Sequence, residues 1–109
     1  AATMLEVFLK EVDQTPPTTS ISIGLNKYIT SNNDVYISPD TTVTLTATDE
    51  AAGVKVTEYR IMGGGYDSDW KVYGGPFTLN QVKVGWADGL YTIQYRSTDN
   101  LGQVDFFLQ

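Results

Sequence analysis

A strict alternation of apolar and threonine side chains between residues 41 and 49 constrains the fold of this chain more than any other feature. The segment reads TTVTLTATD, so Val43, Leu45 and Ala47 fall on one side and the intervening threonines on the other. Successive side chains of an extended strand point to opposite faces, so a period of two sustained over this length predicts a half-buried β-strand.

Other segments follow the same pattern, and turn residues separate them. Alternation is clear at 20–25, 56–62 and 89–99, and shorter runs indicate strands at 35–38, 70–73, 77–79 and 104–108. About seven short strands at roughly 8–12-residue spacing, with no convincing helix, predict an all-β antiparallel β-sandwich. The residues expected to be buried in it are Val43, Leu45, Ala47, Tyr59, Ile61, Tyr91, Ile93 and Tyr95. From the first strand, Ile21, Ile23 and Leu25 are expected to point inward.

The first dozen residues allow two interpretations. The sequence LEVFLK at 5–10 is similar to VDFFLQ at 104–109, as if it were the final strand of a preceding repeat. The alternative is an amphipathic helix that begins at the capping-box sequence from Thr3 to Glu6. The expected division is a repeat remnant or N-terminal extension at 1–12, a proline-stiffened linker at 13–18 and one domain at 19–109.

Several short motifs occur in a fixed order along most of the chain. They are D-x-T-P-P-T at 13–18, V-T-L-T-A-T-D-x-x-x-G-V at 43–54, Y-R-I at 59–61, W-x-x-Y-x-x-P-F at 70–77 and G-x-Y-T-I-x-Y-R-S-T-D-N-x-G at 89–102. With them, residues 13–105 resemble the extracellular immunoglobulin-like repeats of bacteria and archaea, which are related in shape to fibronectin type III modules. The GGGYDSD segment at 63–69 departs from the resemblance because it is longer than the expected turn.

The resemblance implies an immunoglobulin-like sandwich on the prokaryotic cell surface or in a secreted protein. Neighbouring repeats of the same polypeptide are the implied partners, with a surface polysaccharide or a protein as further candidates. The expected function is a non-catalytic spacer or adhesion module that is monomeric as an isolated domain. Two alternatives stay open: a carbohydrate-binding accessory domain of a secreted glycoside hydrolase, and a fibre subunit whose strand 5–10 inserts into a neighbouring copy.

Composition argues against several other functions. The formal net charge of −6 and the pI near 4.3 oppose binding to nucleic acid or to anionic membranes, and no apolar stretch suits membrane insertion. The chain has no histidine and no cysteine, the usual groups for acid–base and nucleophilic catalysis, so no enzyme activity is expected. Its 13 acidic residues leave a glycosidase-like pair formally open, although solvated carboxylates explain them more simply.

Acidic residues suggest one candidate cation site. In an immunoglobulin-like topology, the start of the first strand, the B–C loop and the F–G loop gather at one pole. Calcium prefers several oxygen ligands, which this pole would supply from Asp13, Asp49, Glu50, Asp99 and Asn100. The alternative explanation is that Asp49 and Asp99 only cap the turns that precede Gly53 and Gly102.

Aromatic residues and one charge pair complete the candidates. Tyr91 is expected to pack inward and to return its hydroxyl to nearby backbone, as the tyrosine of a sandwich corner does. Glu58 and Arg96 are expected to form a cross-strand pair. Exposed, coplanar rings can stack on sugars, and the candidates for such glycan stacking are Tyr66, Trp70, Tyr73 and Trp86.

Overall fold

The computed structural model describes residues 16–49 and 53–108, and for 106–108 only the backbone is considered. Several expectations therefore lie outside the described residues: strand or helix at 5–10, the first half of the 13–18 linker, and the candidate ligands Asp13 and Glu50. The division into extension, linker and domain stays a prediction.

The described part of the chain is an all-β domain with nine strands in antiparallel sheets and one helical turn. The elements in chain order are β1 (Thr18–Ile23), β2 (Lys27–Ile29), β3 (Val35–Ile37), β4 (Val43–Thr48), β5 (Val54–Gly63), β6 (Tyr66–Asp67), β7 (Lys71–Val72), α1 (Leu79–Val82), β8 (Thr92–Asp99) and β9 (Val104–Leu108).

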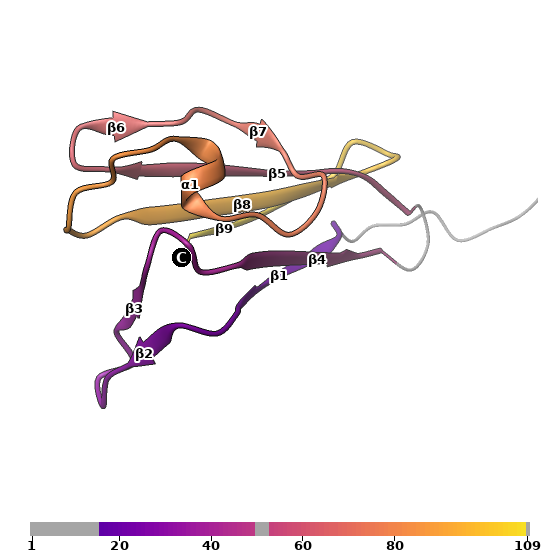
Figure 1. Cartoon of the computed structure of the whole chain (residues 1–109). Coiled ribbons are helices and arrows are strands. Elements are labelled where there is room, and N and C mark those ends of the chain that lie inside the picture. The colour runs from indigo at the N-terminus through magenta and orange to yellow at the C-terminus, as the bar shows by residue number, and fades with distance from the viewer. Residues whose placement is uncertain (1–15, 50–52, 109) are drawn as a thin grey trace, which may run out of the picture.

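Two sheets form the body of the domain. The larger has the strand order β6–β5–β8–β9, with β7 also paired to β5. Its central ladder runs from the pair Val54–Asp99 to the pair Met62–Thr92. The smaller sheet contains β1 and β4, paired from Thr18–Thr48 to Ile23–Val43, and it lies opposite the larger sheet in Figure 1. The third sheet is the β2–β3 hairpin, which projects away from both layers (Figure 1).

The core fills the space between β4 and the paired strands β5 and β8. Its buried residues are Val43, Leu45, Tyr59, Ile61, Phe77, Leu79, Ile93 and Tyr95. The rings of Tyr59 and Phe77 stack with centroids 4.1 Å apart and planes 12° apart. Alternation in the sequence had indicated six of these residues correctly, but Ala47 and Tyr91 are only half-buried. Ala47 lies next to the last residue of β4, at the margin of the core.

The strand expected at 77–79 is wrong beyond its first residue. Phe77 makes a single bridge to Val43, and the chain then turns into α1. The Thr78 N–H donates to Gln81 Oε1 at 3.0 Å, which is half of a capping box and favours a helical start at this point. A helical turn therefore replaces the strand that alternation suggested.

The inward position expected for Leu25 is also wrong, because its side chain is 89% exposed. The strand begins and ends earlier than expected, so β1 stops at Ile23. The Gly24 N–H makes the last bond toward β4, to Thr42 O at 2.8 Å, and the chain then leaves the sheet. β2 and β6 had not been predicted: each is too short for alternation to reveal it.

Truncating the core at Leu45 should weaken folding strongly. Leu45→Ala removes a side chain that is 5% exposed and leaves a cavity, so we expect a loss of about 2–5 kcal/mol in the free energy of unfolding. Val72→Ala on β7 is the matched control, because Val72 is 69% exposed and its truncation should cost less than about 0.5 kcal/mol. Urea denaturation of both variants tests this expectation, and equal losses would contradict the observed core.

Candidate functional site

The turn between β8 and β9 is organised by the carboxylate of Asp99, which is fully buried. Asp99 Oδ1 accepts the N–H groups of Leu101 and Gln103 at 2.9 and 2.8 Å, and its Oδ2 accepts Gln103 Nε2 at 3.1 Å. The backbone closes the same turn through Gly102 N–H to Asp99 O at 3.1 Å. A buried carboxylate is stable only when such donors replace water, so Asp99 acts here as a turn cap.

The loop that leads from β4 to β5 meets this turn at Gly53. Asp49 Oδ1 accepts the Gly53 N–H at 3.3 Å. The Gly53 carbonyl accepts both the backbone N–H and the Nδ2 of Asn100, at 3.1 and 3.2 Å. Gly53 has a φ of +78°, which favours glycine, and a Cβ there would lie 3.2 Å from Asn100 Nδ2. The structure thus brings Asp49, Asp99 and Asn100 to one end of the larger sheet.

The geometry shows that Asp49 and Asp99 both cap turns. Both carboxylates accept hydrogen bonds from their own loops, and the Asn100 Nδ2 donates to the Gly53 carbonyl. Among the residues that the structure describes, no group of three or more acidic, histidine or cysteine side chains is arranged to hold a metal ion. A calcium site that also includes Asp13 and Glu50 stays a prediction, since those two residues lie outside the described part.

An aromatic corner lies where the β5–β6 hairpin approaches the start of β8. Trp86 contacts the rings of Tyr66 and Tyr91 edge to face, each with centroids 5.3 Å apart. The ammonium group of Lys83 lies 4.5 Å from the Trp86 ring centroid. The Tyr91 hydroxyl donates to Ala87 O at 2.6 Å, which confirms the predicted return of this hydroxyl to upstream backbone.

The glycines of this hairpin let it approach Tyr91 closely. A Cβ at Gly63 would lie 2.6 Å from a Tyr91 ring carbon, so a larger residue does not fit without a shift. Gly64 and Gly65 form the tip with φ values of +56° and +80°, the geometry of a tight hairpin turn. The three glycines that begin the long 63–69 segment therefore allow this hairpin to pack against Tyr91 in the aromatic corner.

An ion pair fixes the β5–β6 hairpin from its outer side. Arg60 binds both carboxylate oxygens of Asp67, with Nε to Oδ1 at 2.8 Å. The hydrogen bond from Arg60, followed by that from the Asp69 N–H, lowers the pKa of Asp67 to about 2. The carboxylate therefore stays charged at all ordinary pH values and keeps the hairpin aligned.

Tyr66 and Trp86 are two of the four candidates for glycan stacking. The other two, Trp70 and Tyr73, lie on another part of the larger sheet. The Arg96 guanidinium lies 3.8 Å above the Trp70 ring, and its Nε donates to Glu58 Oε1 at 3.0 Å. This contact confirms the predicted cross-strand pair of Glu58 and Arg96, which face each other on β5 and β8. Tyr73 contacts Phe77 edge to face, with centroids 6.2 Å apart.

None of the four candidates is fully open to solvent. Tyr66, Trp70, Tyr73 and Trp86 are all half-buried. Tyr66 and Trp86 meet with their planes 85° apart, so they do not form a coplanar platform. Trp86 is held further by its Nε1, which donates to Leu79 O at 2.9 Å. Glycan stacking on these rings stays a prediction, although their side chains already pack within the domain.

A pair of open aromatic rings, which sequence reasoning missed, lies on the β2–β3 hairpin. Tyr28 and Tyr36 face each other across the two strands and are 67% and 61% exposed. Their ring centroids are 6.4 Å apart, with planes tilted by 47°. The sequence signal was present but weak: two short runs with tyrosine at the centre flank the turn residues Asn32 and Asn33.

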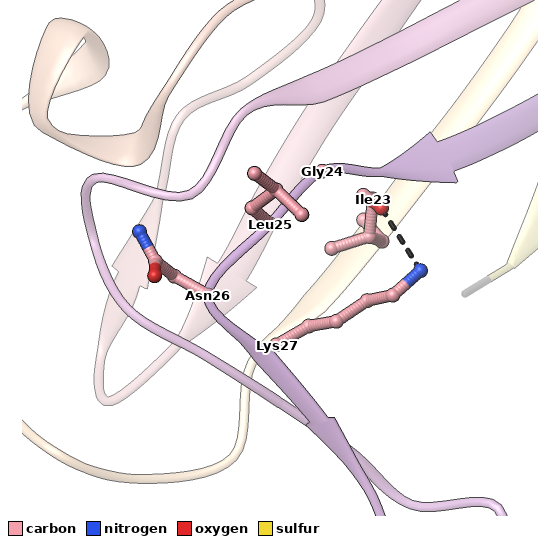
Figure 2. Close-up of a pocket in the computed structure, with 5 residues that line it drawn as sticks. All are labelled: Ile23, Gly24, Leu25, Asn26 and Lys27. Carbon is pink, nitrogen blue, oxygen red and sulfur yellow. Dashed lines mark hydrogen bonds between the residues drawn. The ribbon is translucent and has the colours of Figure 1, made fainter.

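A shallow pocket lies at the base of this hairpin, lined by the consecutive residues Ile23, Gly24, Leu25, Asn26 and Lys27 (Figure 2). Lys27 Nζ donates to Ile23 O at 3.0 Å across the pocket. Lys27 is the one side chain of this lining that can ionise, and its ammonium is already bonded to a carbonyl. The pocket therefore offers no pair of groups for acid–base chemistry.

Removing the Asp99 cap should destabilise the domain whether or not calcium is present. Asp99→Ala leaves the N–H groups of Leu101 and Gln103 without their acceptor, which should cost about 2–4 kcal/mol. Asp88→Ala, at an exposed site, removes the same charge and should cost little. Thermal unfolding with millimolar Ca²⁺ and with a chelator tests the cation. A calcium-dependent rise in Tm that Asp99→Ala abolishes would contradict capping as the sole role of this residue.

Comparison with known proteins adds no relative. No protein-family model, no curated protein and no solved structure matches this chain. Within the described residues, no helix is both long and apolar enough to cross a membrane. The structure identifies a small, mostly β domain of antiparallel sheets.

Proposed function

We propose that this chain is a non-catalytic spacer or adhesion module of a tandem-repeat extracellular or cell-surface protein, with an immunoglobulin-like sandwich as its body. The sandwich architecture is supported by the observation that two antiparallel sheets share one core. The tyrosine corner at Tyr91 supports it further, because the hydroxyl returns to the backbone four residues upstream. The absence of histidine and cysteine from the sequence is consistent with a module that carries out no chemistry.

The observation that carries the proposal is that the chain enters and leaves the described domain at opposite ends. β1 begins beside the end of the larger sheet that holds Asp99, where the Thr19 N–H donates to Asp105 Oδ2 at 2.6 Å. β9 starts at this same end and runs away from it, so Leu108 pairs with Gln94 farther along β8 (Figure 1). Domains with this arrangement can be joined in series without the chain turning back.

A buried chain of hydroxyl groups ties the first strand to the body. Thr19 Oγ1 donates to Ser97 Oγ at 2.8 Å, and Ser97 Oγ lies 2.8 Å from Thr57 Oγ1. Thr19 and Ser97 are both buried, so these bonds are shielded from water and link β1, β8 and β5. Such a link suits a module whose N-terminal strand must stay attached while it is held from both ends.

The open tyrosine pair favours a second candidate function, that of a carbohydrate-binding accessory domain. Tyr28 and Tyr36 present apolar rings with polar hydroxyls on a projecting hairpin, and such rings suit stacking against sugars. They differ from the four residues that the sequence suggested. This candidate is compatible with a place in a tandem array, because the hairpin lies away from the two sheets that form the body.

Two copies of the chain joined in series should form an extended rod. The eight residues of β8 span about 26 Å, and a six-residue extended linker at 13–18 adds roughly 19 Å. Small-angle X-ray scattering should therefore show a maximum dimension at least about 40 Å longer than that of one copy. Pro16→Gly in the linker is the control, and it should broaden the distance distribution. An increase of less than about 20 Å would mean side-by-side packing and would contradict the spacer.

Sugar binding through the hairpin has its own test. Affinity electrophoresis in gels that contain soluble xylan or hydroxyethyl cellulose should retard the full chain. Tyr28→Ser combined with Tyr36→Ser should abolish most of that retardation, because both stacking rings are lost. Val72→Ser, at an exposed position of the larger sheet, is the control and should leave it unchanged. A chain that migrates equally with and without polysaccharide would rule out these two glycans, and equal retardation of all variants would contradict the site on the hairpin.

A further inference from the structure

One face of the β2–β3 hairpin carries a carboxylate beside its two tyrosines. Tyr28 lies opposite Tyr36 in the ladder. Two residues farther along, the Thr30 N–H donates to Asp34 O at 2.9 Å, so the pairing continues to this position. Residues two apart on a strand point to the same face, so Asp34 lies on the face of the tyrosines. Like both rings, Asp34 is exposed.

This tyrosine face is open to solvent. The hairpin projects away from the two main sheets (Figure 1), and Tyr28 and Tyr36 are 67% and 61% exposed. The Asp34 N–H donates to Thr30 Oγ1 at 3.1 Å, but within the described part of the chain nothing donates to the Asp34 carboxylate. The carboxylates of Asp67 and Asp99, in contrast, both accept hydrogen bonds inside the domain.

The angle between the two rings follows from the twist of the hairpin. Paired strands rotate relative to each other, and the rotation is larger when only two strands are present. Side chains that face each other across such a ribbon therefore splay apart. The ring planes of Tyr28 and Tyr36 are 47° apart, and their centroids are 6.4 Å apart. Two rings inclined in this way cannot both lie flat against one plane.

This inclination discriminates between two forms of polysaccharide. A sugar stacks when the flat side of its ring lies against the face of an aromatic ring. The surface of a crystalline polysaccharide is flat, so one tyrosine of the pair can stack on it while the other is turned away. A single chain in solution twists, so its successive sugar rings are inclined to each other. The pair therefore fits neighbouring sugars of one twisted chain.

Asp34 discriminates by charge. An ionised carboxylate accepts hydrogen bonds through both oxygens, and such charge-assisted bonds suit the many hydroxyl donors of a sugar. The same negative charge, in a chain with a net charge of −6, repels a polysaccharide that carries carboxylates of its own. The one basic residue between 27 and 37 is Lys27, which pairs with Ile37 on the other face and donates to Ile23 O.

We propose that the face formed by Tyr28, Asp34 and Tyr36 binds a single, twisted chain of an uncharged polysaccharide. The two rings stack on neighbouring sugars, and the carboxylate accepts hydrogen bonds from their hydroxyl groups. This inference rests on the carbohydrate-binding function given above as the second candidate, and it narrows the class of ligand. Flat crystalline surfaces and acidic polysaccharides are excluded from the site.

Three forms of cellulose, which share one backbone, test the shape and the charge of the ligand. Cosedimentation in about 0.15 M salt limits electrostatic effects to about 8 Å. Under these conditions the full chain should bind soluble hydroxyethyl cellulose and should not bind carboxymethyl cellulose, which is anionic. Its dissociation constant for microcrystalline cellulose should be at least about tenfold higher than for hydroxyethyl cellulose, because one ring no longer stacks.

Variants assign the binding to the tyrosine face. Tyr28→Ser combined with Tyr36→Ser should abolish binding to hydroxyethyl cellulose, whereas Val72→Ser, at an exposed position of the larger sheet, should leave it unchanged. Asp34→Lys should weaken that binding at least about threefold and should create binding to carboxymethyl cellulose, because an ammonium group replaces the repelling carboxylate. Asp88→Lys, an exposed position outside the hairpin, makes the same change in net charge and should behave like the unmodified chain.

The possible failures of the inference and of sugar binding itself are distinct. Circular dichroism shows that each variant is folded, and Tyr28→Ser alone replaces the double variant if the latter is not. The inference is overturned, while sugar binding stands, if tyrosine-dependent binding is equal for microcrystalline and hydroxyethyl cellulose. It is also overturned if Asp34→Lys and Asp88→Lys bind carboxymethyl cellulose alike. Both the inference and the carbohydrate-binding function fail if the full chain binds neither the cellulose forms nor soluble xylan.

Discussion

The pairing of β5 with β8 is the interaction to which the other elements are attached. It runs along most of both strands, from Val54–Asp99 to Met62–Thr92. It holds Tyr59, Ile61, Ile93 and Tyr95 in one buried layer. β6 and β7 fold back onto β5, β9 pairs with β8, and β4 closes the core from the opposite side. Without this ladder, neither the turn around Asp99 nor the aromatic corner would have a support, because each lies at one of its two ends.

Polar groups at the Asp99 end of the larger sheet are hydrogen-bonded within the domain. The Asp99 carboxylate, the hydroxyls of Thr19 and Ser97, and the backbone of Gly53 all have hydrogen-bond partners within the domain. Leaving such groups buried without partners would cost more than their bonds contribute. Asp49 and Asp99, the two described acidic residues of the candidate cation site, therefore each have a structural role as a turn cap.

Alternation along the sequence predicted β4, β5 and β8 because each is long and has one face in the core. Alternation failed at 77–79, where a contact between distant parts of the chain determines the local structure. Phe77 touches β4 at one residue only, because the chain has just crossed from the other sheet, and no local pattern reveals that crossing. The capping pairs at Asp49 and Asp99 were predictable, since they depend on residues a few positions apart. Which aromatic rings stay open was not, because Lys83 and Arg96 cover Trp86 and Trp70 only in the folded chain.

The start of β1 and the end of β9 lie at opposite ends of the described domain, which has a mechanical consequence. A force that pulls outward on both ends acts along β1 and β9, parallel to the strands and perpendicular to their ladder hydrogen bonds. Those bonds are then loaded in shear and must break together, whereas strands peeled apart from one end lose their bonds one at a time. The contact between Thr19 and Asp105 joins the two loaded strands directly. The domain would therefore stay folded until the pulling force reaches a threshold, and it would then unfold in a single step.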